Sequence, residues 1–146
     1  DLVIITNVEK NKFYEELKQK THFENDPRIK FVGTVYDAEL LKYIRENALG
    51  YLHGHSVGGT NPSLLEALGS TRLNLLLDVG FNKEVGESGA LYWGTKQGEL
   101  KHVLESVAKL DQTQKDQLAK VAKQRIKQQY SWEKIVTDYE NIFLRG

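Results

Sequence analysis

A glycine-rich stretch followed by a helix start is the part of this sequence best suited to binding a phosphate. It runs from Gly58 to Glu66 and reads Gly-Gly-Thr-Asn-Pro-Ser-Leu-Leu-Glu. Glycines let a backbone approach a ligand closely, and Asn61 followed by Pro62 is typical of a helix cap and the first helical position. The N–H groups at a helix start, together with the positive end of its dipole, attract anions. The segment therefore predicts a phosphate site.

The residues expected to form this site surround the start of the helix. We expect the amides of Ser63 and Leu64 to point outward without partners. Glu66, one turn further along, is placed to accept two hydrogen bonds from a vicinal diol such as a ribose, which suggests a nucleoside-diphosphate site. The loop expected to contact the diphosphate and the sugar comprises Gly58, Gly59, Thr60, Asn61, Ser63, Leu64 and Leu65. The same pattern is also a common way to turn from a strand into a helix, so the surrounding sequence must decide.

Other side chains near the loop suggest further contacts. His53 and His55 alternate along a strand end, so a pair of metal ligands is an open alternative. A third ligand is not obvious nearby, and we expect no metal, with His55 and Ser56 lining the cleft instead. Val35 and Tyr36 end an earlier strand, where the base of a nucleotide could lie. The Gly-x-Ser-x-Gly turn of a serine hydrolase and the acidic pair of a receiver domain are both absent.

Composition narrows the class of protein. The chain has 146 residues, 40% hydrophobic and 27% charged, as expected for one compact soluble domain. Its 20 basic and 20 acidic side chains create no bulk positive field, so nucleic acid is not an expected partner. No apolar run is long enough to span a membrane, no signal peptide heads the sequence, and the lack of cysteine fits a cytoplasmic location. Because the chain lacks methionine and begins almost directly with a strand, we expect it to be part of a longer protein.

The elements that must hold these residues alternate between strands and helices. Apolar runs predict strands at residues 2–5, 29–35, 50–53, 73–77 and 90–93, with the first buried on both faces. Helical spacing predicts helices at residues 9–20, after Asp37, and from Pro62 through Leu68. Residues 80–89 predict a loop with at most one short helical turn. This alternation predicts an α/β fold with a Rossmann-like parallel sheet, helices on both faces, and ligands at the carboxyl ends of the strands.

The last third of the chain predicts helices. Asp111 is a good cap for one helix, and Ser131 is a good cap for the final one. We expect the apolar and aromatic stripe of the final helix to be ordinary core. That stripe comprises Trp132, Ile135, Val136, Tyr139, Ile142 and Phe143.

Taken in order along the chain, these strands, helices and motifs resemble the C-terminal domain of retaining glycosyltransferases that have two facing Rossmann-like domains. These enzymes are the family-4-like group with the GT-B fold. The matching pieces are the strand at residues 29–35, the Pro-Ser-Leu-Leu-Glu-Ala-Leu helix, Asp78-Val79-Gly80 with Glu84, Val85 and Gly89 after it, and Tyr130-Ser131-Trp132. They cover nearly the whole chain. The resemblance implies that residues 1–146 are the nucleotide-sugar-binding half of a GT-B fold. The N-terminal acceptor domain and a first strand and helix, which carries a basic diphosphate clamp, would lie upstream.

The resemblance also implies roles for single residues. In that family two glutamates eight positions apart bracket the loop, the second binding the donor ribose and the first touching the sugar. Glu66 matches the second, whereas Gly58 stands at the first, and Ser56 is the nearest polar side chain upstream. Catalysis would be electrostatic, with loop amides stabilising the departing diphosphate and with neither a cofactor nor a divalent metal. No catalytic residue is assigned within the fragment, which we expect to be inactive by itself.

A narrower resemblance concerns the donor. His53-Gly54-His55 and the Gly-Gly-Thr-Asn-Pro-Ser run look most like bacterial rhamnosyltransferases that build capsule or cell-wall polysaccharide. This implies transfer of L-rhamnose from a thymidine-diphosphate donor to a lipid-linked saccharide acceptor. It is compatible with peripheral association of the full-length protein at the inner membrane face. Glucose, galactose or mannose donors stay open, as do a nucleotide-sugar epimerase of the same fold and a non-enzymatic nucleotide-binding module.

Overall fold

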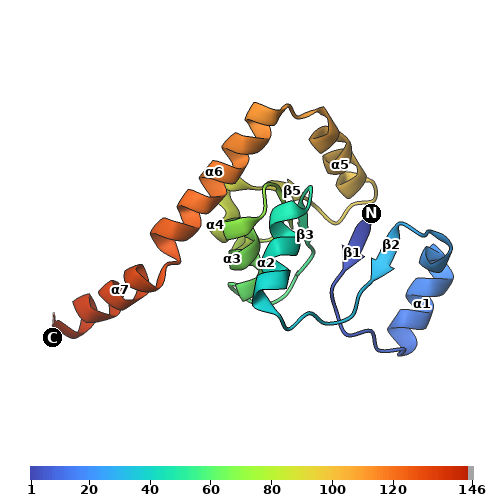
Figure 1. The fold of residues 1–146 in the computed structure, drawn as a ribbon, viewed down its shortest axis with the longest axis horizontal. Helices are drawn as coiled ribbons and strands as arrows, with labels where there is room; N and C mark the ends of the chain where they lie inside the picture. The colour runs from blue at the N-terminus through green and yellow to red at the C-terminus, as the bar shows by residue number, and fades with distance from the viewer. Residues whose placement is uncertain (145–146) are drawn as a thin grey trace. The chain divides into compact units, whose positions relative to one another are not determined.

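The computed structural model describes residues 1–144 and divides the chain into two compact units, Asp1–Leu41 and Lys42–Gly146 (Figure 1). The predicted α/β class with parallel strands is confirmed. The strands form two sheets, one with the order β1-β2 and one with the order β3-β4-β5. Each sheet belongs to its own unit, and each unit is described by itself below.

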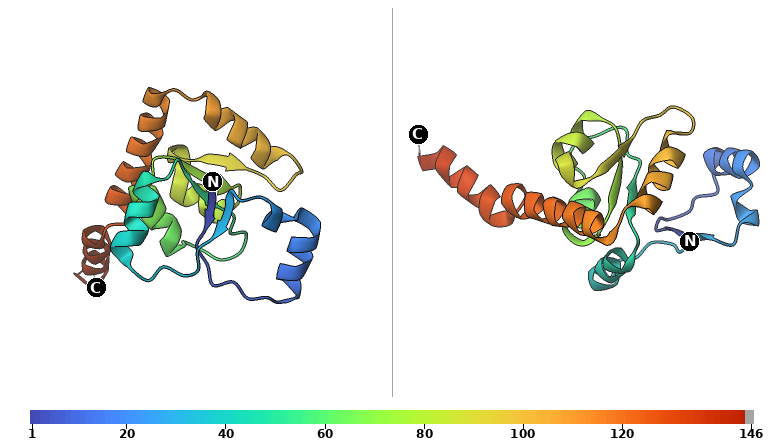
Figure 2. Two further views of the ribbon diagram at one scale, coloured as in Figure 1. Left: turned by 45° about the vertical axis from the view of Figure 1, so that its right-hand side comes forward. Right: turned by 90° about the horizontal axis from the view of Figure 1, so that it is seen from above.

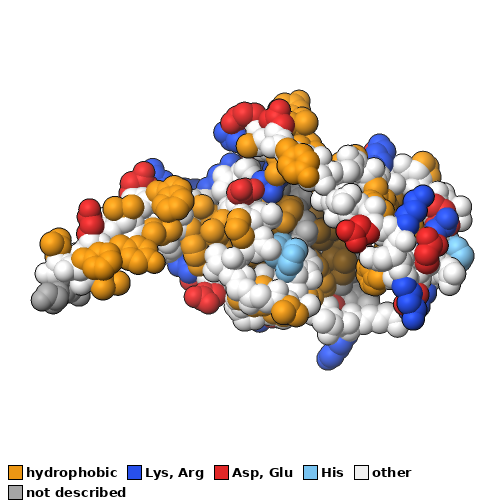
Figure 3. Space-filling view, turned by 90° about the horizontal axis from the view of Figure 1, so that it is seen from below, with side chains coloured by type: hydrophobic (Ala, Val, Ile, Leu, Met, Phe, Trp, Pro, Cys, Tyr) orange, Lys and Arg blue, Asp and Glu red, His pale blue; other side chains and the backbone are white. Residues whose placement is uncertain are grey.

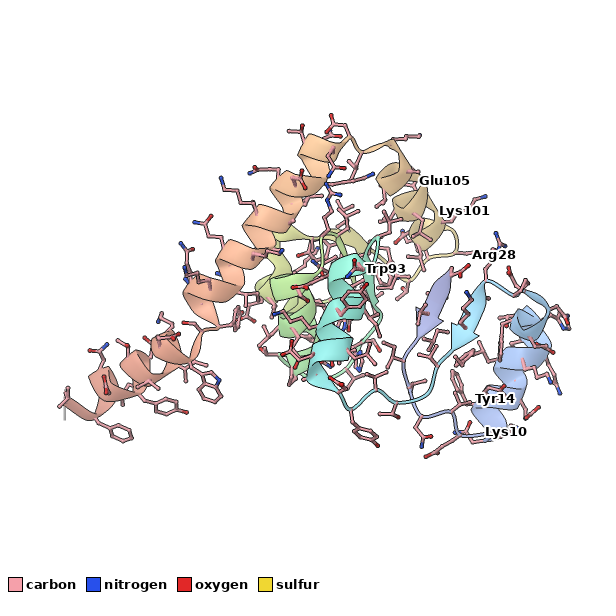
Figure 4. The ribbon with its side chains drawn as sticks, in the orientation of Figure 1. Lys10, Tyr14, Arg28, Trp93, Lys101 and Glu105 are labelled. Carbon is pink, nitrogen blue, oxygen red and sulfur yellow. The ribbon has the colours of Figure 1, made fainter. Side chains whose placement is uncertain are left out.

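The first unit contains a two-stranded parallel sheet with a helix between its strands. Its elements are β1 (Leu2–Ile4), α1 (Lys12–Thr21), the 3₁₀ turn η1 (Phe23–Asn25) and β2 (Ile29–Phe31). α1 starts later than predicted, because the Asn11 side chain caps it by accepting a hydrogen bond from the Tyr14 amide at 3.0 Å. Tyr14 projects from α1 and packs against Phe23 with ring centroids 5.6 Å apart (Figure 4).

The strands of the first unit are shorter and less buried than predicted. They end at residues 4 and 31 instead of 5 and 35. Leu2 and Val3 are 42% and 44% exposed, so the prediction of burial on both faces is wrong for this strand. The physical reason is the size of the sheet, since two strands offer too little area to bury both faces.

The second unit contains the larger sheet, and α2 leads into it from the first unit. Its elements are α2 (Ala38–Asn47), β3 (Tyr51–His53), α3 (Pro62–Ser70), β4 (Asn74–Leu77), α4 (Gly80–Gly86), the 3₁₀ turn η2 (Glu87–Gly89), β5 (Leu91–Trp93), α5 (Glu99–Lys109), α6 (Gln112–Gln129) and α7 (Trp132–Leu144). The central strand β4 pairs in parallel with both neighbours, so that Leu75 lies opposite Leu52 on one side and Leu91 on the other.

Helices lie on both sides of this sheet, which confirms the predicted layers (Figure 2). Two clusters of hydrophobic side chains pack against it. On one face Leu76 belongs to a cluster built with α3, α4 and α6, which includes Leu68 and Ala122. On the other face Leu75 belongs to a cluster with Val107 of α5. Successive strand residues point to opposite faces, so a strand buried on both sides must be apolar throughout, as β4 is after its first residue.

The segment at residues 80–89 corrects one prediction. It forms the helix α4 and the turn η2 instead of a loop with at most one helical turn. Val85 and Asn82 of α4 are buried, and tertiary packing therefore outweighs the helix-breaking glycines. At Gly89 the chain passes so close to α6 that an added Cβ would lie 2.7 Å from Ala122 Cα, which explains the glycine there.

The final helix corrects another prediction. No residue of α7 is buried, and Trp132, Ile142 and Phe143 are 78%, 68% and 76% exposed. Apolar side chains gather along this helix on the face seen in Figure 3. The stripe expected to be core is therefore surface in the described chain, because periodicity shows which face of a helix is apolar but not whether another element covers it. Within residues 1–144, no helix combines the length and apolarity needed to cross a membrane.

Candidate functional site

The glycine-rich loop joins the carboxyl end of β3 to the start of α3, the position predicted for a ligand site. Residues 54–60 are all exposed. Gly58 has a φ of +121°, a conformation that residues with a side chain rarely adopt. A residue with a side chain would be strained at this position, which explains the glycine there.

The start of α3 differs from the prediction in its hydrogen bonds. Asn61 is the expected cap, and its Oδ1 accepts a hydrogen bond from the Ser63 amide at 2.9 Å. Its carbonyl oxygen accepts from the amides of Leu64 at 3.0 Å and Leu65 at 3.1 Å. The expectation that the amides of Ser63 and Leu64 lack partners is therefore wrong, because the Asn61 cap satisfies both.

Free hydrogen-bond donors lie one step earlier, in the loop itself. Among the described residues, the N–H groups of Gly58, Gly59 and Thr60 have no hydrogen-bond partner. Such a run of exposed amides beside a helix N-terminus can bind an anion. Leu64 instead points its side chain into the core, where it is 0% exposed, so it anchors the helix beneath the loop.

Glu66 lies one turn into α3 and has a partner that the sequence analysis missed. Its Oε2 accepts a hydrogen bond from Nη1 of Arg45 at 2.6 Å. The Glu66 side chain is 58% exposed, whereas the Arg45 side chain is 10% exposed. A signal for this was present, since Arg45 occupies a helical spacing shared with Leu41 and Ala48, where an apolar residue is expected.

A line of aromatic and imidazole rings follows β3 toward the loop. The Tyr51 hydroxyl lies 3.1 Å from Nδ1 of His53, and the His53 ring stacks on His55 with centroids 4.7 Å apart. Burial lowers the pKa of His53, and the charge of His55 lowers it further. Burial also raises the pKa of Tyr51, which feels the opposing charges of Arg45 and Glu66. The protein therefore favours an uncharged His53 beside the loop.

The two histidines do share one side of the chain, as their spacing predicted. Within residues 1–144, however, no group of three or more His, Asp or Glu side chains could hold a metal ion. His53 is 1% exposed, and its Nε2 has no hydrogen-bond partner in this part of the chain. His55 and Ser56 are exposed at the start of the loop, where they can face a ligand.

Asn82 is a second residue that the sequence analysis missed. It is completely buried on α4, and its Nδ2 donates to the backbone oxygen of Leu77 at 3.0 Å and to that of His55 at 3.2 Å. These bonds tie the start of the glycine loop to the end of β4. An asparagine within a glycine-rich run is typical of a turn, so only the fold reveals this role.

The predicted base-binding residues belong to a different unit from the rest of the site. Val35 and Tyr36 lie in the first unit, and Tyr36 is 93% exposed. The loop, Glu66 and their supports all lie in the second unit.

No protein-family model matches the chain, and no curated protein matches it.

Proposed function

We propose that this chain is the donor-binding half of a retaining glycosyltransferase of the GT-B type. The observation that carries the proposal is the pairing of free loop amides at residues 58–60 with the exposed carboxylate of Glu66 one turn into α3. Amides of this kind suit a diphosphate, and a carboxylate suits the hydroxyls of a sugar. Both groups lie at the carboxyl end of a parallel sheet, where nucleotides commonly bind.

In this proposal the loop acts electrostatically. The amides of Gly58, Gly59 and Thr60 stabilise charge on the departing diphosphate, while the donor phosphate assists the incoming hydroxyl. Asn82 bonds to the backbone of His55 at the start of the loop and Asn61 caps the helix at its end. Restraints of this kind reduce the reorganisation needed during the reaction. His55 and Ser56 line the entrance.

The proposed donor is thymidine-diphosphate-activated L-rhamnose. Gly58 offers no side chain to the hydroxyls of a hexose, so a fully hydroxylated hexose lacks a binding contact there. A 6-deoxy sugar has one hydroxyl fewer and therefore loses less binding energy. The acceptor is a lipid-linked saccharide of capsule or cell-wall synthesis, bound by a further domain at the cytoplasmic face of the membrane. The His53-Gly54-His55 pattern, which resembles that of bacterial rhamnosyltransferases, also supports this donor.

A donor screen on the full-length protein tests the proposal. We expect turnover with thymidine-activated rhamnose, retained in the presence of a chelator. Turnover with uridine- or guanosine-activated hexoses and none with the rhamnose donor would end the rhamnose assignment. Activity lost in the chelator and restored by zinc or manganese would favour a metal site at His53 and His55 instead.

A non-catalytic nucleotide-binding module is the second candidate, and Gly58 favours it. With glycine at that position and a φ of +121°, the loop carries no carboxylate toward the sugar. Such a module would bind nucleoside diphosphates without turnover in the full-length protein. An epimerase of the same fold would instead isomerise the free donor in the absence of any acceptor. Incubation of the donor with and without acceptor therefore separates the transferase, the binding module and the epimerase.

A further inference from the structure

His55 is held at both its backbone and its ring, although it lies at the start of an exposed loop. Its carbonyl oxygen accepts a hydrogen bond from Nδ2 of the buried Asn82 at 3.2 Å. Its imidazole stacks on that of His53, with ring centroids 4.7 Å apart and 18° between the planes. An exposed loop side chain ordinarily keeps its rotamer freedom, so these two restraints indicate a ring that is positioned to meet a ligand.

The supporting ring of His53 is buried in a way that favours its neutral form. It is 1% exposed, and among the described residues its Nε2 has no hydrogen-bond partner that could stabilise a charge. Its Nδ1 lies 3.1 Å from the hydroxyl of Tyr51, and burial raises the pKa of Tyr51, so this hydroxyl keeps its proton and can donate a hydrogen bond to Nδ1. A charged His53 would carry a proton on Nδ1 and could not accept that bond.

The stacked pair therefore carries its charge on the exposed ring. Two charged imidazoles at this distance would repel each other, and burial disfavours the charge on His53. His55 is the only ionisable side chain in residues 54–61. Among the described residues, neither of its ring nitrogens has a hydrogen-bond or ion-pair partner. Both nitrogens are thus available to a ligand.

The acidic groups on the neighbouring elements already have cationic partners. Glu66 of α3 pairs with Arg45 of α2 at 2.6 Å, and Asp78, which follows β4, pairs with Lys83 of α4 at 2.7 Å. The protonated form of His55 is therefore left for an anion that comes from outside the chain.

We propose that His55 is the cation that binds the donor diphosphate at the glycine loop, and that His53 is a positioning residue that supports its ring. His55 precedes the free amides of residues 58–60 by three positions. Three residues span at most about 11 Å, a distance that a diphosphate and the histidine side chain together can bridge. One phosphate then meets the amides and the other meets the imidazolium. This inference rests on the proposed function, because it requires a diphosphate at the loop.

Calorimetric titration of the full-length protein at several pH values tests the inference. The probes are thymidine-diphosphate-rhamnose and uridine-diphosphate-glucose, both titrated in the presence of a chelator. The phosphates of a nucleotide sugar are diesters that keep their charge between about pH 8 and about pH 5.5, the range in which histidine gains its own charge, whereas a terminal phosphate titrates near pH 6. At least one probe should bind about tenfold more tightly at the lower pH, as a charge-assisted hydrogen bond replaces a neutral one.

Three variants assign the pH dependence to one histidine, and a fourth is the control. His55→Gln keeps a hydrogen-bond donor without the charge, so the tightening should fall below about twofold. His55→Lys is charged throughout, and at about pH 8 it should bind within about threefold of the affinity of the unmodified protein at about pH 5.5. His53→Phe keeps a neutral ring behind His55 and should keep the tightening. His102→Gln, at an exposed position of α5, should keep it as well.

Two results would overturn the role of His55 and leave the proposed function intact. One is binding of a probe with the same affinity across the pH range in the unmodified protein, a measurement that requires no variant to fold. The other is tightening that persists in His55→Gln and disappears in His53→Phe, because the titrating group would then be His53. Failure of both probes to bind at any pH would overturn the proposed function itself.

Discussion

Helices α3 and α7 share a sequence pattern but differ in their surroundings. Each has apolar residues at helical spacing and a polar cap, since Asn61 accepts from the Ser63 amide and the Ser131 hydroxyl accepts from the Lys134 amide at 3.2 Å. In α3, Leu64, Ala67 and Leu68 are 0% exposed, whereas no residue of α7 is buried. The comparison shows that periodicity locates the apolar face of a helix, whereas the fold decides whether another element packs against that face.

This difference has a consequence for the site. Because α3 is anchored in the core, its first turn and Glu66 can be held against Arg45 with little freedom. A binding residue on a helix without such anchoring would lose more conformational entropy on meeting a ligand. The candidate site therefore lies on the more rigidly packed of the two helices.

The largest expected effect is on the stability that α3 provides. Leu68→Ala should lower the free energy of unfolding by about 2–5 kcal/mol, because it leaves a cavity at a completely buried position. Denaturant unfolding followed by circular dichroism measures the change. A loss below about 1 kcal/mol would contradict the view of α3 as a core helix.

The next effect concerns the polar face of α3. Glu66→Ala should weaken nucleoside-diphosphate binding by tenfold or more, since a charge-assisted hydrogen bond is worth about 1.5–3 kcal/mol. Calorimetry on the folded full-length variant measures it. Glu133→Ala, at an exposed position in the first turn of α7, is the matched control and should bind as the unmodified protein does. Unchanged affinity in Glu66→Ala would remove this residue from the site.

A smaller effect should appear as a pH dependence of stability. Burial lowers the folded-state pKa of His53 below its unfolded value, so the unfolded chain binds the proton more readily. The free energy of unfolding should therefore fall as the pH drops below about 6.5, the unperturbed value for histidine, and should level off below the lowered folded-state pKa. In His53→Asn this slope should be reduced, whereas His102→Asn, at an exposed position of α5, should keep it. Equal slopes in both variants would show that His53 does not cause the dependence.

The smallest expected effect is on α7. Ile142→Ser should change the free energy of unfolding by no more than about 0.5 kcal/mol, because the side chain is 68% exposed. The same unfolding measurement as for Leu68→Ala gives a direct comparison of the two helices. A loss of more than about 2 kcal/mol would show that the stripe of α7 is buried in the protein in solution.

Local features of the fold were predictable from the sequence. Asp111 caps α6 as predicted, with its side chain 2.8 Å from the Gln114 amide and the Gln114 side chain bonded back to the cap. Asn61 caps α3, and β4 lies between two hydrophobic layers. These features follow from interactions between residues that are close in the sequence, or from the spacing of the apolar positions. Both can be read directly from the sequence.

The sequence by itself determined the α/β class, the helix caps, and the loop that precedes Glu66. The tertiary structure alone decided that Arg45 pairs with Glu66, 21 positions away, and that Asn82 holds the backbone of His55, 27 positions away. It also decided the separation into two sheets and the exposure of α7. The physical reason is that caps and periodicity depend on neighbours along the chain, whereas burial and ion pairing depend on which distant segments pack together.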